Sequence, residues 1–183
     1  MKVLITYYSQ SGQTEKIANV ISDTVKGKFE TDLLKLKQVN LKTINEYDLV
    51  FVGAPCHHSD LVKQVQKFLK KLPKGASFKL VGFYTHACMP PETSEEDKVL
   101  FERWVGKCQP TFEKIASEKE IDLLGTFRCQ AKATPPIEKF IRKQIITDDK
   151  KWEEYLPDLR ERPKKEDLDK ARDFALKILQ QVS

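Results

Sequence analysis

Short apolar runs alternate along the chain with longer stretches in which apolar residues recur at helical spacing. Buried strands are typically short, apolar and rich in β-branched or aromatic residues, whereas helices repeat apolar residues three and four positions apart. The pattern predicts strands at 2–8, 32–37, 48–54, 78–85 and 120–130. It predicts helices from about 13 to 27, 59 to 72, 94 to 117 and 164 to 182. Strand and helix therefore alternate almost from end to end.

This alternation determines the expected fold class. A strand followed by a helix and a further strand favours parallel pairing with right-handed crossovers. The run DLVFVGA at 48–54 is apolar throughout, which is typical of a central strand covered on both faces. Lysines alternate with leucines at 32–37, as in an exposed edge strand. We predict an α/β fold with a doubly wound five-stranded parallel sheet and helices on both faces.

The helix expected at 94–117 has a start signal and an apolar face. Ser94 and Asp97 have the spacing of a capping box. Trp104 and Cys108 lie on the apolar face, and we interpret both as packing residues.

The segment at about 134–163, between the fifth strand and the last helix, is irregular. Four prolines bracket it, and a connection of this length without its own structure would be unusual. We expect part of it to be helical and to pack near the carboxyl edge of the sheet. Trp152 and Tyr155 either hold this segment down or cover a ligand at that edge.

Length and composition indicate one soluble globular unit. A chain of 183 residues can bury one core but is short for two ordinary domains, so we expect a single domain over 1–183. Its residues are 40% hydrophobic and 32% charged, which excludes a disordered chain. Neither a membrane span nor a signal-peptide pattern is visible, and we expect a cytoplasmic protein.

Charge and cysteines exclude two further classes. The net charge of +5 is spread through the sequence and forms no basic stripe interleaved with aromatics, so nucleic-acid binding is not expected. The four cysteines are widely spaced without a CxxC pair. In a cytoplasmic chain this pattern indicates reduced thiols rather than a disulfide framework.

The loop between the first strand and the first helix carries the main chemical signal. Ser9, Ser11 and Thr14 place three hydroxyls in a tight loop, and Gly12 permits a close turn. The loop opens onto a helix N-terminus, where backbone N–H groups and the helix dipole favour an anion. It contains no lysine or arginine and matches neither common glycine-rich nucleotide motif. An uncharged, hydroxyl-rich cradle favours a monophosphate; the alternative is that the hydroxyls only cap the helix.

The segment VLITYYSQSGQTEKIANVI resembles the N-terminal signature of the flavodoxin family. The resemblance implies a sheet of order 2-1-3-4-5 and one non-covalently bound FMN. It places Ser9, Gln10, Ser11, Gly12, Gln13 and Thr14 around the FMN phosphate. Ser11 and Gln13 stand where threonine and asparagine are commonest in the family, and both replacements keep a hydroxyl or an amide.

The resemblance also implies two loops beside the flavin ring, at the point where the strand order reverses. The second loop contributes Pro55, Cys56, His57 and His58, and the third contributes Thr85, His86 and Ala87. The three histidines are the candidate proton donors. Because cysteines occupy the same loops, a Cys/His metal site is an alternative; no pair has the spacing of a preformed ligand pair, and we predict no metal.

Two functions remain open under this resemblance. One is an electron-transfer protein that shuttles electrons between redox partners; because this chain is basic, its partners would have acidic docking faces. The other is an NAD(P)H-dependent FMN reductase or quinone reductase, with 134–163 forming a substrate pocket. A binding module that has lost the flavin, or uses it structurally, is a third possibility.

Overall fold

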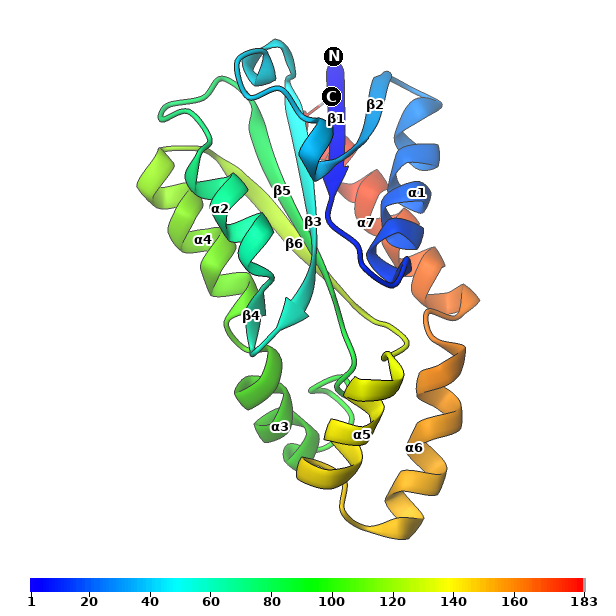
Figure 1. Cartoon of the computed structure of the whole chain (residues 1–183). Coiled ribbons are helices and arrows are strands. Elements are labelled where there is room, and N and C mark those ends of the chain that lie inside the picture. Colours follow the sequence, from blue (N-terminus) through cyan, green and yellow to red (C-terminus); the bar gives the residue numbers. More distant parts are fainter. Residues whose placement is uncertain (183) are drawn as a thin grey trace.

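Five parallel strands form the central sheet, in the order β2-β1-β3-β5-β6 (Figure 1). The computed structural model describes residues 1–182. The strands are β1 (Lys2–Tyr7), β2 (Glu30–Lys35), β3 (Leu49–His57), β5 (Lys79–His86) and β6 (Leu123–Gln130), with a short β4 (Asp60–Leu61) paired antiparallel to β3. This order confirms the predicted doubly wound sheet, since β5 and β6 are the fourth and fifth strands of the parallel path.

Helices cover both faces of the sheet, as predicted (Figure 1). They are α1 (Gln13–Lys26), α2 (Lys63–Lys70), α3 (Glu95–Val105), α4 (Cys108–Lys119), α5 (Pro135–Gln144), α6 (Asp149–Glu161) and α7 (Lys165–Val182), with single 3₁₀ turns at Leu36–Gln38 and Ile44–Glu46. On one face α1 and α7 pack over Ile5 and Phe51. On the other, α2 and α4 pack over Val50 and Val52. Both faces of β3 are therefore buried, which explains its continuous apolar run.

The prediction of a helix at 59–72 was wrong at its start. The chain first turns back at His58 and Ser59, where φ is 51° and 66°, and Asp60–Leu61 pairs with the end of β3. The Asp60 carboxylate accepts hydrogen bonds from the Leu61 backbone and the Thr111 hydroxyl, both at 2.7 Å. These bonds hold the hairpin, so α2 begins only at Lys63.

The single helix predicted at 94–117 is two helices. Ser94 caps α3 as expected, because its hydroxyl accepts the Asp97 backbone N–H at 3.1 Å. The helix breaks after Val105, where Gly106 is followed four residues later by Pro110, which has no N–H to donate to the Gly106 carbonyl. At the break the Lys107 backbone N–H donates instead to the Ser59 carbonyl of the hairpin at 3.0 Å.

Strand ends also differ from prediction by a few residues. The second strand begins at Glu30 rather than 32, and the third continues past 54 to His57. The last strand begins at Leu123 because Glu120 ends α4 in a left-handed conformation, with φ of 55°.

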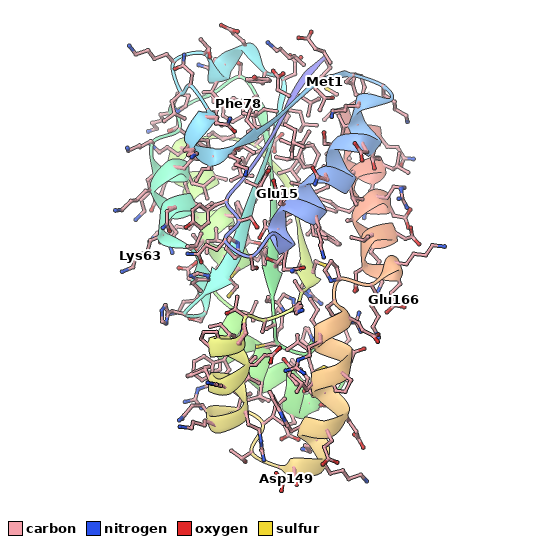
Figure 2. All side chains as sticks on the ribbon, turned by 45° about the vertical axis from the view of Figure 1, so that its right-hand side comes forward. Met1, Glu15, Lys63, Phe78, Asp149 and Glu166 are labelled. Atoms are coloured by element: carbon pink, nitrogen blue, oxygen red, sulfur yellow. The ribbon has the colours of Figure 1, made fainter. Side chains whose placement is uncertain are left out.

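Helices α5 and α6 form a hairpin, here called the helical arm (135–161), beyond the carboxyl ends of the strands (Figures 1 and 2). Figure 2 places Asp149 at its tip, farthest from the sheet. Tyr155 and Leu159 are buried against Ile141 in a small core of the arm's own. This confirms that the segment is largely helical and packs at that edge. At its base, the Arg162 guanidinium pairs with the Asp158 and Asp167 carboxylates.

Candidate functional site

Three loops meet where β1, β3 and β5 end, and they border a cavity of about 450 Å³. The sheet edge brings together most residues predicted from the sequence: Gln10, Ser11, Gln13, Thr14, Pro55, Cys56, His57, His58, Thr85, His86 and Ala87 line it. Ser9 and Gly12 belong to the first loop but are not among the lining residues. The predicted site residues thus converge on one cavity, although they come from segments up to about 70 positions apart.

The first loop presents a free helix N-terminus. Gly12 precedes α1 with φ of 81°, a left-handed conformation that favours glycine. No atom lies within 4 Å of the position that a Cβ would take there. No side chain caps the first turn of α1. The interpretation that the loop hydroxyls serve only as helix caps is therefore wrong.

Two polar atoms of this loop are buried without a hydrogen-bond partner in the described chain. They are the Ser9 hydroxyl and the Gln13 side-chain oxygen. The Gln13 amide nitrogen donates weakly to the Ser11 carbonyl, at 3.5 Å. Leaving a buried polar group unpaired costs about 1–3 kcal/mol. An anion between Ser9 and the first turn of α1 would accept from the hydroxyl and from the free N–H groups.

The first and third loops are joined by a buried hydrogen bond. The hydroxyls of Thr14 and Thr85 lie 2.9 Å apart, and both side chains are buried. Thr14 thus points into the sheet edge rather than toward solvent. The bond fixes the first turn of α1 relative to the end of β5.

The second loop is a strained turn. His58 and Ser59 both adopt positive φ although neither is glycine. His57 and His58 are exposed at the cavity mouth. Burial and the neighbouring His58 lower the pKa of His57. A flat imidazole therefore stands at the mouth and is uncharged at neutral pH.

His86 in the third loop is buried and neutral. Its Nδ1 lies 3.1 Å from the Cys88 carbonyl, and its ring packs edge-on against Phe101 at 5.0 Å. Burial and the nearby Arg128 lower the pKa of His86 to about 3. His86 is thus an uncharged hydrogen-bonding group in the folded chain, which disfavours a role as an acid.

The helical arm and the end of α3 supply an apolar half of the cavity. The predicted site residues do not include it, although the reductase alternative placed a substrate pocket at 134–163. Trp104, Val105, Ile137, Phe140, Ile141 and Ile145 line it. Trp104, interpreted from the sequence as a core residue, lies half-buried with its ring edge-on to Phe140 at 5.2 Å. The amphipathic pattern of 137–145 was a visible signal for this half. Nothing in the sequence linked Trp104 to it.

Trp152 and Tyr155 mainly stabilise the packing of the arm. Trp152 packs against the arm's small core, and Tyr155 is buried there. The Tyr155 hydroxyl also donates to the Ala87 carbonyl, and so does the Gln130 amide at 3.5 Å. The arm therefore supports the third loop from behind.

The cysteines form no metal centre in the part of the chain that the structure describes. No group of three or more histidine, cysteine or acidic side chains there is arranged to hold a metal ion. All four thiols are free. Burial raises the pKa of the Cys88 thiol to about 12, so it stays protonated. The Cys56 thiol donates to the Trp104 carbonyl at 3.4 Å, which ties the second loop to α3.

Comparison with known proteins gives consistent matches. A family model for the flavodoxin domain matches residues 4–128. A flavodoxin from Clostridium saccharobutylicum is 29% identical over 84 residues, which are 45% of this chain and about half (51%) of that protein. An uncharacterized protein of Methanocaldococcus jannaschii is 27% identical over 98% of this chain and 99% of its own.

Solved structures agree on the fold. Oxidised flavodoxin 2 from Bacillus cereus superposes with a TM-score of 0.65 at 19% identity, covering 99% of both chains. A flavodoxin from the domain Archaea has a TM-score of 0.64 at 15% identity, covering 100% of this chain and 99% of its own. No described helix of the present chain is long and apolar enough to cross a membrane. The match to the family model covers most of the chain, and the chain therefore belongs to the flavodoxin family.

Proposed function

We propose that this chain binds one FMN non-covalently and acts as an electron-transfer protein of the cytoplasm, folded as a single domain. The first loop carries the proposal: an uncapped helix N-terminus lies beside a buried, unpartnered Ser9 hydroxyl. Those groups suit a phosphate, and the family of this chain supports assigning that phosphate to FMN.

The residues present fit FMN at both ends. Ser9, Gln10, Ser11, Gly12, Gln13 and Thr14 would hold the phosphate, and the open space at Gly12 leaves room for it. Pro55, Cys56, His57 and His58 would flank one side of the ring, and Thr85, His86 and Ala87 the other. When bound, FMN supplies reversible one- and two-electron redox chemistry.

The protein's own contribution is orientation, exclusion of water and control of charge. The Thr14–Thr85 bond fixes the two loops relative to each other. Neutral His86 adds no charge at the third loop. The apolar side chains of α3 and the arm line the far side of the cavity. None of these groups is positioned as a dedicated acid or base.

The test is reconstitution with FMN followed by stepwise anaerobic reduction. We expect one FMN per chain, reduced in two separate one-electron steps and exchanging electrons with protein donors and acceptors. Failure to bind FMN would remove the proposal. A single two-electron step would favour the second candidate.

The second candidate is an NAD(P)H-dependent FMN or quinone reductase. The apolar half of the cavity favours it, because Trp104 and Phe140 lie where a flat acceptor would meet the ring loops. Steady-state oxidation of NAD(P)H with a quinone by the purified holoprotein alone would establish the reductase. If such turnover is absent but the holoprotein still exchanges electrons with protein partners, the electron-transfer function is favoured.

A further inference from the structure

An apolar patch lies exposed on the arm beside the cavity. Ile137 and Phe140 are 47% and 40% exposed, and the only other exposed large apolar side chains of the described residues are Met1 and Val99. They lie three positions apart on α5, so they share one face. Both also line the cavity, and Phe140 contacts Trp104 of α3. The patch is thus continuous with the site proposed for FMN.

Five cationic side chains lie on or next to the elements that carry this patch. The Arg103 guanidinium lies over the Trp104 ring at 5.2 Å, and Lys132 lines the cavity. Lys139 and Lys143 lie one turn apart on the exposed side of α5, and Lys107 follows α3. Within residues 1–182 none of these five cations forms an ion pair.

On α5 itself a single carboxylate accompanies these cations. Glu138, the carboxylate of α5, is buried and paired with Arg160 at 2.8 Å. Glu102, near the end of α3, is exposed and without an ion pair among the described residues. The exposed charges of α5 and of the segments that follow α3 and precede α5 are therefore positive, whereas acidic residues gather at the start of α3 and on α6.

We propose that this basic-rimmed patch (Trp104, Ile137 and Phe140 with Arg103, Lys107, Lys132, Lys139 and Lys143) docks the acidic face of a redox partner protein. The inference rests on the proposed electron-transfer function, because the patch lies where the cavity that would hold the flavin opens. An apolar centre with a charged rim is typical of a protein interface. Unpaired cations steer an acidic partner and hold it in register. The occupant is a protein with clustered carboxylates.

The experiment uses an acidic [2Fe–2S] ferredoxin as the probe. Carbodiimide joins lysines of this chain to carboxylates of the probe, and mass spectrometry locates the linked lysines. We expect links at Lys107, Lys132, Lys139 and Lys143, and binding that weakens as salt is added. The map is made with and without added FMN, because the docking surface does not require bound flavin.

Two charge-reversal variants distinguish the effect of charge at the patch from the effect of the chain's net charge. Lys139→Glu with Lys143→Glu should weaken binding at low ionic strength by about tenfold or more. The matched control is Lys26→Glu with Lys28→Glu, which changes charge equally at the exposed, unpaired far end of α1. The control should bind nearly as the unmodified chain does.

Three outcomes would overturn the docking surface: equal weakening by both variants, links concentrated on lysines elsewhere, or no salt-sensitive complex with the probe. Equal competition by an unstructured DNA oligonucleotide would show a general polyanion surface and overturn it too. Absorption spectra report FMN retention separately. A chain that loses FMN binding but keeps the link map would refute the proposed function and leave the docking surface standing.

Discussion

Replacing Gly12 by valine tests the proposed phosphate site most directly. Gly12 has φ of 81°, and the space beside its Cα is open for at least 4 Å. A valine side chain would fill that space at the N-terminus of α1. Gly75 offers a matched control, because it also has positive φ, 64°, and open space around its Cα, but lies outside the cavity.

Both substitutions should lower folding stability, but only Gly12→Val should also lower FMN affinity. A residue with a Cβ pays about 1–2 kcal/mol in the left-handed conformation, so both variants should lose that much folding stability. Only Gly12→Val would also obstruct an anion. Losing two hydrogen bonds to a charged group, at about 1.5–3 kcal/mol each, removes about 3–6 kcal/mol of binding. At about 1.4 kcal/mol per tenfold, FMN affinity should fall by about a hundredfold or more.

The assay is quenching of flavin fluorescence, with riboflavin as the second ligand. Riboflavin carries the same ring without the phosphate, so its affinity should change little in Gly12→Val. The ratio of FMN to riboflavin affinity therefore isolates the phosphate. We expect this ratio to collapse in Gly12→Val and to stay unchanged in Gly75→Val. An unchanged ratio in Gly12→Val would refute the assignment of the first loop.

Three smaller predictions test the supports of the site. Thr85→Val leaves the buried Thr14 hydroxyl unpaired and should lower the free energy of unfolding by about 1–3 kcal/mol, read from urea denaturation. Tyr155→Phe removes the hydrogen bond to the Ala87 carbonyl, so the free energy of unfolding should fall by about 0.5–1.5 kcal/mol and amides of the third loop should exchange faster. Unchanged exchange would show that Tyr155 does not support this loop. Because the pKa of His86 is lowered to about 3 in the folded chain, the unfolded state binds its proton first, and stability should fall as pH drops below 6.5. By pH 5 the free energy of unfolding should be lower by about 2 kcal/mol. An NMR titration midpoint for His86 near 6.5 would refute this prediction.

Strands and the first loop were predictable because their signals are local. The continuous apolar run of β3 is typical of a buried central strand. The conformation of the SQSGQT loop is indicated by residues next to one another in the sequence. Residues of the second and third loops followed from topology, since the ends of neighbouring parallel strands share one edge.

Features set by distant contacts were not predictable. The break between α3 and α4 did have a local signal, Gly106 followed by Pro110, but its hydrogen bond to Ser59, about 48 positions earlier in the chain, had none. The turn at His58 has no glycine to mark it, so its positive φ is set by the hairpin. Trp104 has ordinary core spacing, and only the arrival of Phe140 from the arm makes it a cavity residue.

The first loop and the helical arm contribute different parts of the site, so substitutions in the arm need not affect the first loop. The phosphate loop depends on residues between β1 and α1, and its link to the third loop runs through Thr14 and Thr85. The third loop is also held from behind by Tyr155 of α6, 68 positions later in the chain. The same arm supplies Ile137, Phe140, Ile141 and Ile145 of the cavity lining and two of the proposed docking cations, Lys139 and Lys143. Substitutions in the arm can therefore alter the ring environment and the docking charge together, without touching the residues that would hold the phosphate.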